Sequence, residues 1–245
     1  MKLAVWNMCN KANQEQAKTQ ILDYFGAGYD AVALQEVPYA PTGQPLTNDI
    51  ASESGLHQNF IHTRGLSRRG ERLVGYGTAI LSTSPLIDVH HATIRSDRWS
   101  YMTSGDGNQR VAVAFSDRSN PDIRIAVSHL SYRLVGGIGS VGMRQERTNL
   151  YRFLAEQHSR GELIFAGDMN CKPETELDIG LADIGLVSVV PNYDADSGYT
   201  YQSRYPGLGS IRANLDRVYA SSKVTPQVRL GNFGVSDHRP LEIEL

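Results

Sequence analysis

The residues of this chain best suited to chemistry lie in short polar motifs that follow apolar runs. They are Trp6-Asn7, Gln35-Glu36, Ser128-His129-Leu130, Gly167-Asp168-Met169-Asn170, Asn214-Leu215-Asp216 and Ser236-Asp237-His238. The motifs supply carboxylates, two imidazoles and side-chain amides. That mixture suits a hard divalent cation together with a proton-transfer pair, which is the equipment for hydrolysing phosphate esters.

Each motif adjoins a run that predicts a β-strand, and several of these runs are continuously apolar, as in strands covered on both faces. The expected strands are Leu3–Trp6, Ala31–Leu34, Val74–Leu81, Val111–Phe115, Ile123–Ser128, Leu163–Ala166, Leu215–Ala220 and Leu241–Leu245. The turn-rich segment between the fourth and fifth of them predicts a hairpin. Because strand ends can present side chains that converge on one point, we expect the motifs to form a single site.

Helices are expected between these strands. Asn13 can cap a helix that runs to Phe25, and a second apolar stripe predicts a helix over Met143–Gln157. Pro173 suits the first turn of a short helix over Glu174–Leu181. Strands and helices interleave without a linker or a repeat, so we expect one α/β domain over residues 1–245.

Composition sets the class of protein. The chain has 245 residues, 40% of them hydrophobic, and a formal charge of −2, so attraction for a polyanion must be local. Cys9 and Cys171 each follow a motif and are expected to be reduced thiols packed beside the site. No run is long enough for a secretory signal or a bilayer span, so we expect a soluble, cytoplasmic protein.

Two readings are open for each oxygen-bearing motif residue. Glu36 ends an apolar strand and is either a metal ligand or a surface ion-pair partner, since a bare carboxylate there is costly. Asn7 is either a ligand or a turn former. Asp168 and Asn170 point the same way from an extended segment, where they can hold a water and a phosphoryl oxygen, or form an Asx turn.

His129 and His238 are the two imidazoles that accompany such motifs. Histidine can bind phosphate as imidazolium or transfer a proton near neutral pH. Asp216 can then fix the tautomer and orientation of His238. The remaining histidines are expected to be packed or exposed without a role, namely His57, His62, His90, His91 and His158.

The motifs, in this order and together with Gly-Thr-Ala-Ile-Leu at 77–81 and Leu-Asp-Arg-Val-Tyr at 215–219, resemble the endonuclease/exonuclease/phosphatase superfamily over the whole chain. The resemblance implies the deoxyribonuclease-I-like fold, an α/β four-layer sandwich of two central mixed β-sheets flanked by helices. It also implies an active site at one sheet edge and a Mg²⁺ or Mn²⁺ cofactor. Ser128-His129-Leu130 stands where apurinic endonucleases carry a tyrosine motif.

Roles follow from the resemblance, motif by motif. Glu36 would be the main metal ligand, with Asn7 and Asp237 close to the metal. Among the expected catalytic residues, His129 would bind the phosphate and assist the leaving group, and Asp168 and Asn170 would position the water and the phosphate. His238 would be the general base with Asp216 as its partner carboxylate, and Arg110 would contact the phosphate. The carboxylate partner of His129 is unassigned, because Glu71 lies in no motif.

A metal-dependent phosphodiesterase acting on nucleic acid, DNA rather than RNA, is the favoured function. The arginine-rich segment 64–72 and the aromatic residues Trp99 and Tyr101 can serve phosphates and bases, as can Arg133 and Arg144. One alternative is a phosphatase or phospholipase-C-type hydrolase acting on a phosphorylated lipid or small molecule, and Leu134–Ile138 is a weak candidate for the membrane-contacting loop that a lipid would require. The other alternative is a non-catalytic scaffold. No stable membrane association and no protein partner are expected.

Overall fold

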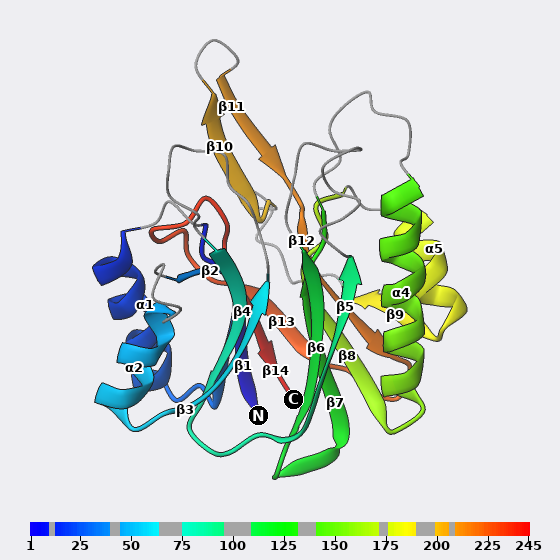
Figure 1. Cartoon of the computed structure of the whole chain (residues 1–245), viewed down its shortest axis with the longest axis horizontal. Helices are drawn as coiled ribbons and strands as arrows, with labels where there is room; N and C mark the ends of the chain where they lie inside the picture. The colour runs from blue at the N-terminus through cyan, green and yellow to red at the C-terminus, as the bar shows by residue number, and fades with distance from the viewer. Residues whose placement is uncertain are drawn as a thin grey trace.

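The computed structural model describes residues 1–9, 13–39, 45–63, 75–95, 109–131, 141–171, 176–189, 199–205 and 209–245. Two six-stranded sheets face each other, and helices cover their outer faces (Figure 1). The fold is thus the expected α/β sandwich.

The first sheet is built around the N-terminal strand. Its order is β13 (Gln227–Leu230), β14 (Leu241–Glu244), β1 (Lys2–Asn7), β2 (Ala31–Tyr39), β4 (Gly75–Ser82) and β3 (His57–Thr63). Strands β1 and β2 are parallel and the other neighbours are antiparallel, so the sheet is mixed.

The second sheet repeats this arrangement. Its order is β5 (Ile87–Arg95), β6 (Arg110–Asp117), β7 (Asn120–His129), β8 (Glu162–Asp168), β12 (Asp216–Ser221) and β9 (Leu186–Val189). Only β7 and β8 are parallel among its pairs. A separate hairpin of β10 (Tyr201–Tyr205) and β11 (Gly209–Ala213) stands beyond the end of the sheets and leads into β12 (Figure 1).

Helices α1 (Gln14–Gly26) and α2 (Leu46–Ser54) cover the first sheet, and α4 (Val141–His158) and α5 (Glu176–Asp183) cover the second (Figure 1). The Asn13 side chain caps α1 by accepting a hydrogen bond from the Gln16 N–H (3.2 Å), as the sequence predicts. This cap satisfies a backbone donor that the first helical turn leaves without a helical partner.

Three apolar layers hold the sandwich together. Val5, Phe115 and Ile125 belong to the layer between the two sheets. A second layer packs the first sheet against α1 and α2, with Trp6 fully buried in it. A third packs the second sheet against α4 and α5, around residues such as Phe165. Both faces of each sheet are therefore covered, which explains the continuous apolar runs of the inner strands.

The eight expected strands, the three expected helices and the hairpin between β6 and β7 are confirmed. Strands β3, β5, β9, β10, β11 and β13 and helix α2 were not predicted. Several expectations fall on residues outside the described ranges, namely segment 64–72, Glu71, Trp99, Tyr101, Arg133, Leu134–Ile138 and Pro173. Across the described part of the chain, none of the helices has the length and apolar character needed to cross a membrane.

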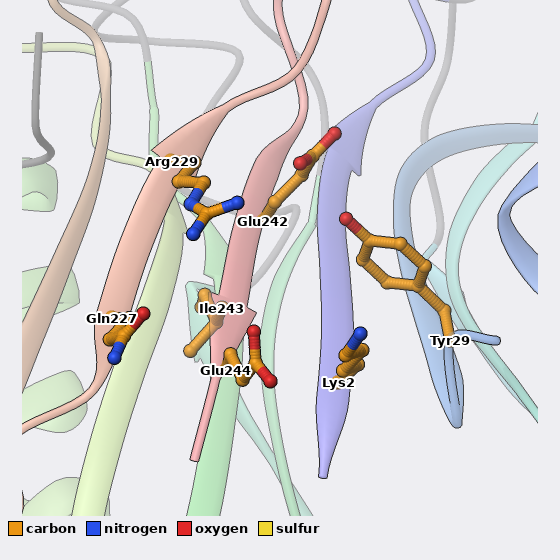
Figure 2. Close-up of a pocket in the computed structure, with 7 residues that line it drawn as sticks. All are labelled: Lys2, Tyr29, Gln227, Arg229, Glu242, Ile243 and Glu244. Carbon is orange, nitrogen blue, oxygen red and sulfur yellow. The ribbon is translucent and has the colours of Figure 1, made fainter. Parts of the chain in front are cut away.

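A surface groove lies at the start of β1 (Figure 2). It is lined by Lys2, Tyr29, Gln227, Arg229, Glu242, Ile243 and Glu244. Lys2 begins β1 and Asn7 ends it, so roughly 17 Å of extended strand separates this groove from the first motif. The motif residues must therefore be sought at the other end of the sheets.

Candidate active site

Four strand ends meet at one edge of the two sheets. Asn7 ends β1, His129 ends β7 and Asp168 ends β8. His129 and Asp168 lie opposite each other because β7 and β8 are parallel and in register. Asp216 begins β12, which is antiparallel to β8, and is paired with Asp168. The topology thus brings side chains from both sheets to one place.

Glu36 reaches this place from a β-bulge instead of a strand end. We expected the strand to stop at Leu34, but β2 continues to Tyr39 with a register shift between Leu34 and Val37. Glu36 has a φ of 54°, in the left-handed region that is uncommon for residues other than glycine. Such a bulge re-aims the side chain, and Glu36 Oε1 lies 3.6 Å from His129 Nε2.

Asp168 is the most connected carboxylate of the site. Its Oδ2 accepts a hydrogen bond from Asn7 Nδ2 (3.0 Å), and its Oδ1 accepts one from the Asn170 N–H (2.8 Å). The Asp168 N–H donates to Gln35 Oε1 (3.3 Å). Burial raises the pKa of Asp168 to about 6, and the nearby Asp216 carboxylate acts in the same direction.

Gly167 is required for this placement. Its φ is 144°, and a Cβ at this position would lie 2.0 Å from the Ser128 carbonyl oxygen and 2.7 Å from Gln35 Nε2. A side chain here would push apart the parallel strands that carry His129 and Asp168. The glycine therefore allows the close approach of backbone that the motif predicts.

His238 and Asp216 form a buried pair. His238 Nδ1 lies 2.8 Å from Asp216 Oδ2, and the two residues are only 5% and 3% exposed. Burial opposes protonation of the ring, but the carboxylates of Asp216 and Asp168 outweigh it and raise the pKa of His238 to about 10. The backbone N–H of His238 donates to Ser236 Oγ (3.0 Å), and the Ser236 hydroxyl donates to the Asn7 carbonyl (2.7 Å).

His129 has the opposite electrostatic surroundings. Arg110 Nη1 donates to His129 Nδ1 (2.8 Å), and Asn170 Nδ2 lies 2.9 Å from His129 Nε2. Burial lowers the pKa of His129 well below its usual value, and the charge of Arg110 lowers it further. The guanidinium and the amide NH₂ are both donors, and a neutral imidazole has one acceptor nitrogen, so the ring can accept from Arg110 or from Asn170 but not from both. His129 Nε2 lies 3.5 Å from Asp168 Oδ2.

Asp237 lies at the rim of the site. Its Oδ1 is 4.0 Å from His238 Nε2, and its side chain is 31% exposed. Its carbonyl accepts a hydrogen bond from the Gln202 N–H (2.8 Å). The main chain of Asp237 is therefore held in place by this hydrogen bond, while its carboxylate is partly exposed to solvent.

Thr200 and Tyr201 contribute to the site although neither was predicted. Thr200 Oγ1 accepts hydrogen bonds from the N–H groups of Leu215 (2.9 Å) and Asp216 (3.0 Å), and the residue is fully buried. The Tyr201 ring lies 4.9 Å from the His238 ring, centroid to centroid. Neither residue belongs to a motif, and the pair of tyrosines around Thr200 is a weak signal in sequence.

Cys9 and Cys171 are half-buried thiols outside any disulfide, as the sequence predicts. The Cys9 N–H donates to Asn7 Oδ1 (3.0 Å), and Cys171 Sγ lies 2.9 Å from Arg217 Nη2. Both cysteines therefore pack beside motif residues without a disulfide.

Oxygen atoms dominate the groups that could hold a cation. Ligand atoms of Asp168, Asp216 and His238 lie within 4.8 Å of one another. Asp216 and His238 are already hydrogen-bonded to each other, and this arrangement suits a proton-transfer pair better than two metal ligands. Glu36, Asn7, Asp168 and Asp237 offer carboxylate and amide oxygens, which are the ligands of Mg²⁺ and Mn²⁺. The donor set therefore fits a hard divalent cation.

The sequence profile of the endonuclease/exonuclease/phosphatase family matches residues 4–238. The chain belongs to this family. Its fold and its cluster of carboxylates and imidazoles agree with that membership, and the protein is a phosphoric ester hydrolase of the divalent-metal-dependent kind. No curated protein sequence matches the chain.

Solved structures of family members share the fold. A 3′-5′ exonuclease from Neisseria meningitidis superposes with a TM-score of 0.71 at 19% identity, over 100% of this chain and 99% of the exonuclease. A Neisseria 3′ phosphatase bound to a product DNA hairpin gives 0.70 at 18% identity, over 100% and 99%. TDP2 from D. rerio with a single-strand DNA product gives 0.63 at 17% identity, over 99% and 97%.

Proposed function

We propose that residues 1–245 act as one catalytic domain that hydrolyses phosphodiester bonds in nucleic acid, DNA before RNA, with Mg²⁺ or Mn²⁺. The observation that carries the proposal is the position of Asp168 between two imidazoles. Its Oδ2 lies 3.5 Å from His129 Nε2 and 3.7 Å from His238 Nε2. In this arrangement the carboxylate can orient a water, and an imidazole N–H beside it can hold a phosphoryl oxygen.

Glu36 is proposed as the main metal ligand, with Asn7 and Asp237 beside it. Strain supports this role, because a glutamate in the left-handed region costs about 1–3 kcal/mol and persists where the surroundings impose it. A divalent cation held there would supply positive charge to the phosphoryl oxygens and would oppose the protonation of His238.

His238 is proposed to accept the proton of the attacking water. A single water can bridge His238 Nε2 and Asp168 Oδ2 and hydrogen-bond to both, since the two atoms lie 3.7 Å apart. Asp216 holds the opposite ring nitrogen at 2.8 Å, so that Nε2 is the free nitrogen of the neutral ring and the imidazolium that forms is stabilised. Asp168 orients the water.

His129 is proposed to hold a phosphoryl oxygen. Arg110 lies at Nδ1, and Nε2 faces Asp168 and Glu36, where a neutral ring with its proton on Nε2 would donate to a phosphoryl oxygen. Arg110 thus acts through the ring, in addition to any direct contact with phosphate. The Asn170 amide, 2.9 Å from the same Nε2, would hold a second phosphoryl oxygen. The leaving-group role expected of His129 would need the imidazolium form, which burial and the charge of Arg110 disfavour by lowering the pKa of the ring.

Nucleic acid is the substrate that the relatives favour. The Neisseria 3′ phosphatase is bound to a DNA hairpin and D. rerio TDP2 to a single-strand DNA product. The alternatives are a phosphorylated small molecule and a phosphorylated lipid, and the candidate membrane-contacting loop for the lipid, Leu134–Ile138, lies outside the described residues. A non-catalytic scaffold is disfavoured, because every motif retains a chemically competent residue.

A substrate panel tests the proposal. The purified protein with Mg²⁺ is given single- and double-stranded DNA, RNA, a phosphomonoester, sphingomyelin and a phosphoinositide. We expect the highest kcat/KM on DNA, and no activity in Asp168→Asn. Asp183→Asn, an exposed position at the end of α5, is the matched control and should be fully active. Faster hydrolysis of the lipids or the monoester would overturn the nuclease assignment.

A further inference from the structure

An aromatic and cationic stack borders the site on the side of the β10–β11 hairpin. The rings of Tyr199 and Phe233 lie 5.6 Å apart with 33° between their planes. The Arg212 guanidinium carbon lies 4.6 Å from the Tyr199 ring centroid, and the Arg239 guanidinium carbon lies 5.6 Å from that of Phe233. We call Tyr199 and Phe233 the aromatic ledge.

The ledge is held firmly on both sides. The Tyr199 hydroxyl donates to Gln202 Oε1 (2.9 Å). Arg239 Nε donates to the Gly231 carbonyl (2.6 Å), which fixes the loop that carries Phe233. The rings are therefore pre-organised, so that a ligand would not pay the entropy of ordering them.

The ledge also adjoins the catalytic pair. The Arg239 N–H donates to the Thr200 carbonyl (2.7 Å), which joins the segment after His238 to the segment after Tyr199. Tyr201, two residues beyond Tyr199, contacts the His238 ring at 4.9 Å. In Figure 1 the hairpin rises from the sheet edge at which the catalytic strands end. A ligand with its reacting group at His238 could therefore extend along this segment to the ledge.

The ledge is open to solvent. Phe233 is 37% exposed, and Arg212 is exposed beside it. Two other large apolar side chains among the described residues are more exposed, Ile179 on α5 and Val187 on β9, but both are aliphatic and offer no ring for stacking. Single exposed apolar groups are ordinary, whereas a partly exposed pair of rings with a guanidinium beside each ring suits a flat, anionic ligand.

We propose that the aromatic ledge stacks against an unpaired base of a single-stranded nucleic acid whose neighbouring phosphate lies in the catalytic site. The inference rests on the proposed function and narrows its substrate to strands with an unpaired base at this position. Every base has a π-face that such rings accept, and Arg212 and Arg239 add attraction for the adjoining phosphates. A fully paired base offers no free face to the ledge.

Abasic scanning tests the ledge. A single-stranded DNA oligonucleotide receives one abasic residue, moved along the chain, and kcat/KM is measured with Mg²⁺. In the wild type, we expect one abasic position near the cleavage site to cost about 10-fold, mainly through KM, because base–aromatic stacking has that magnitude. In Phe233→Ala and Tyr199→Ala, the intact oligonucleotide should be cut about 10-fold less well, and the abasic position should cost nothing more.

Three controls accompany the scan. A fully abasic oligonucleotide should be cut equally by the wild type and both variants, which shows that the catalytic site is intact. Phe233→Tyr keeps a ring and should retain the abasic effect. Val187→Ala removes an exposed apolar side chain from β9 and should behave as the wild type.

The outcomes separate the two claims. If the wild type cuts oligonucleotides but no abasic position matters, or if the effect persists in both ring-less variants, the ledge is overturned and the nuclease stands. If the wild type cuts no oligonucleotide and hydrolyses another phosphoester, the proposed function fails and the ledge fails with it. Weaker binding of Phe233→Ala to phosphatidylcholine vesicles, with unchanged cleavage, would assign the ledge to lipid and overturn the inference.

Discussion

Replacing Asp216 with asparagine should slow catalysis without disturbing the fold. The change is isosteric, and the Asp216 N–H keeps its bond to Thr200 Oγ1 while the backbone keeps its pairing with Asp168. What is lost is the charged hydrogen bond to His238 Nδ1 at 2.8 Å, in a pair that is almost fully buried. An amide can also hold the wrong tautomer of the ring.

The size of the effect follows from that contact. A hydrogen bond to a charged group contributes about 1.5–3 kcal/mol. Since about 1.4 kcal/mol corresponds to a tenfold change in rate, we expect kcat to fall at least about 10- to 150-fold. His238→Ala removes the proton acceptor itself and should cost about 100- to 10,000-fold.

The assay is a double-mutant cycle on kcat with a DNA oligonucleotide at saturating Mg²⁺. Residues that act as a unit are non-additive. The variant that carries both Asp216→Asn and His238→Ala should therefore be no slower than His238→Ala alone. If the two losses multiply, the side chains work independently, and the proposed pairing of the general base His238 with Asp216 is wrong. Unchanged urea unfolding of Asp216→Asn shows that the fold is intact.

Three further perturbations have defined outcomes. Arg110→Gln should lower kcat about 10- to 100-fold on oligonucleotides through loss of a charge-assisted hydrogen bond to His129, with Mg²⁺ affinity unchanged in calorimetric titration. Gly167→Ala should lower the free energy of unfolding by about 3 kcal/mol, because its Cβ would meet the Ser128 carbonyl, and urea denaturation that matches the wild type would contradict this. Glu146 lies buried on α4, where its Oε1 accepts a hydrogen bond from the Ser131 N–H (2.8 Å). Burial raises the pKa of Glu146 above its ordinary value of 4.5, so its protonated form is favoured by folding. The contribution of protonated Glu146 to stability is therefore full below pH 4.5 and is lost as pH rises through the folded pKa. In urea denaturation repeated at a series of pH values, the free energy of unfolding of the wild type should decline over this pH range relative to that of Glu146→Gln.

The strands that the sequence predicts are the inner strands of both sheets. Strands β14, β1, β2 and β4, and β6, β7, β8 and β12, are buried on both faces and therefore carry continuous apolar runs. The edge strands β13, β3, β5 and β9 have one unpaired side and more exposed residues, such as His57 in β3 and His91 in β5. Their composition resembles that of loops, and a pattern of apolar residues cannot identify them.

The site divides in the same way. Strand-end motifs predicted which segments would converge, because parallel neighbours place their carboxyl ends together. The bulge at Glu36 was not predictable, because it depends on pairing between β2 and β4. The contact of Arg110 with His129 and the stack of Tyr199 with Phe233 join residues that are distant in sequence or belong to no motif. Single residues of this kind give no periodic signal.

The central claim is that the strand-end cluster hydrolyses phosphodiesters with a divalent metal held by Glu36. The most direct test is the initial rate of DNA oligonucleotide hydrolysis against free Mg²⁺ concentration, for the wild type and Glu36→Gln. We expect no rate in chelator, saturable recovery with Mg²⁺ in the wild type, and a loss of at least about 100-fold in Glu36→Gln, as for other catalytic groups acting in the transition state. Full activity of the wild type in chelator, or a Glu36→Gln curve that coincides with that of the wild type, would contradict the account.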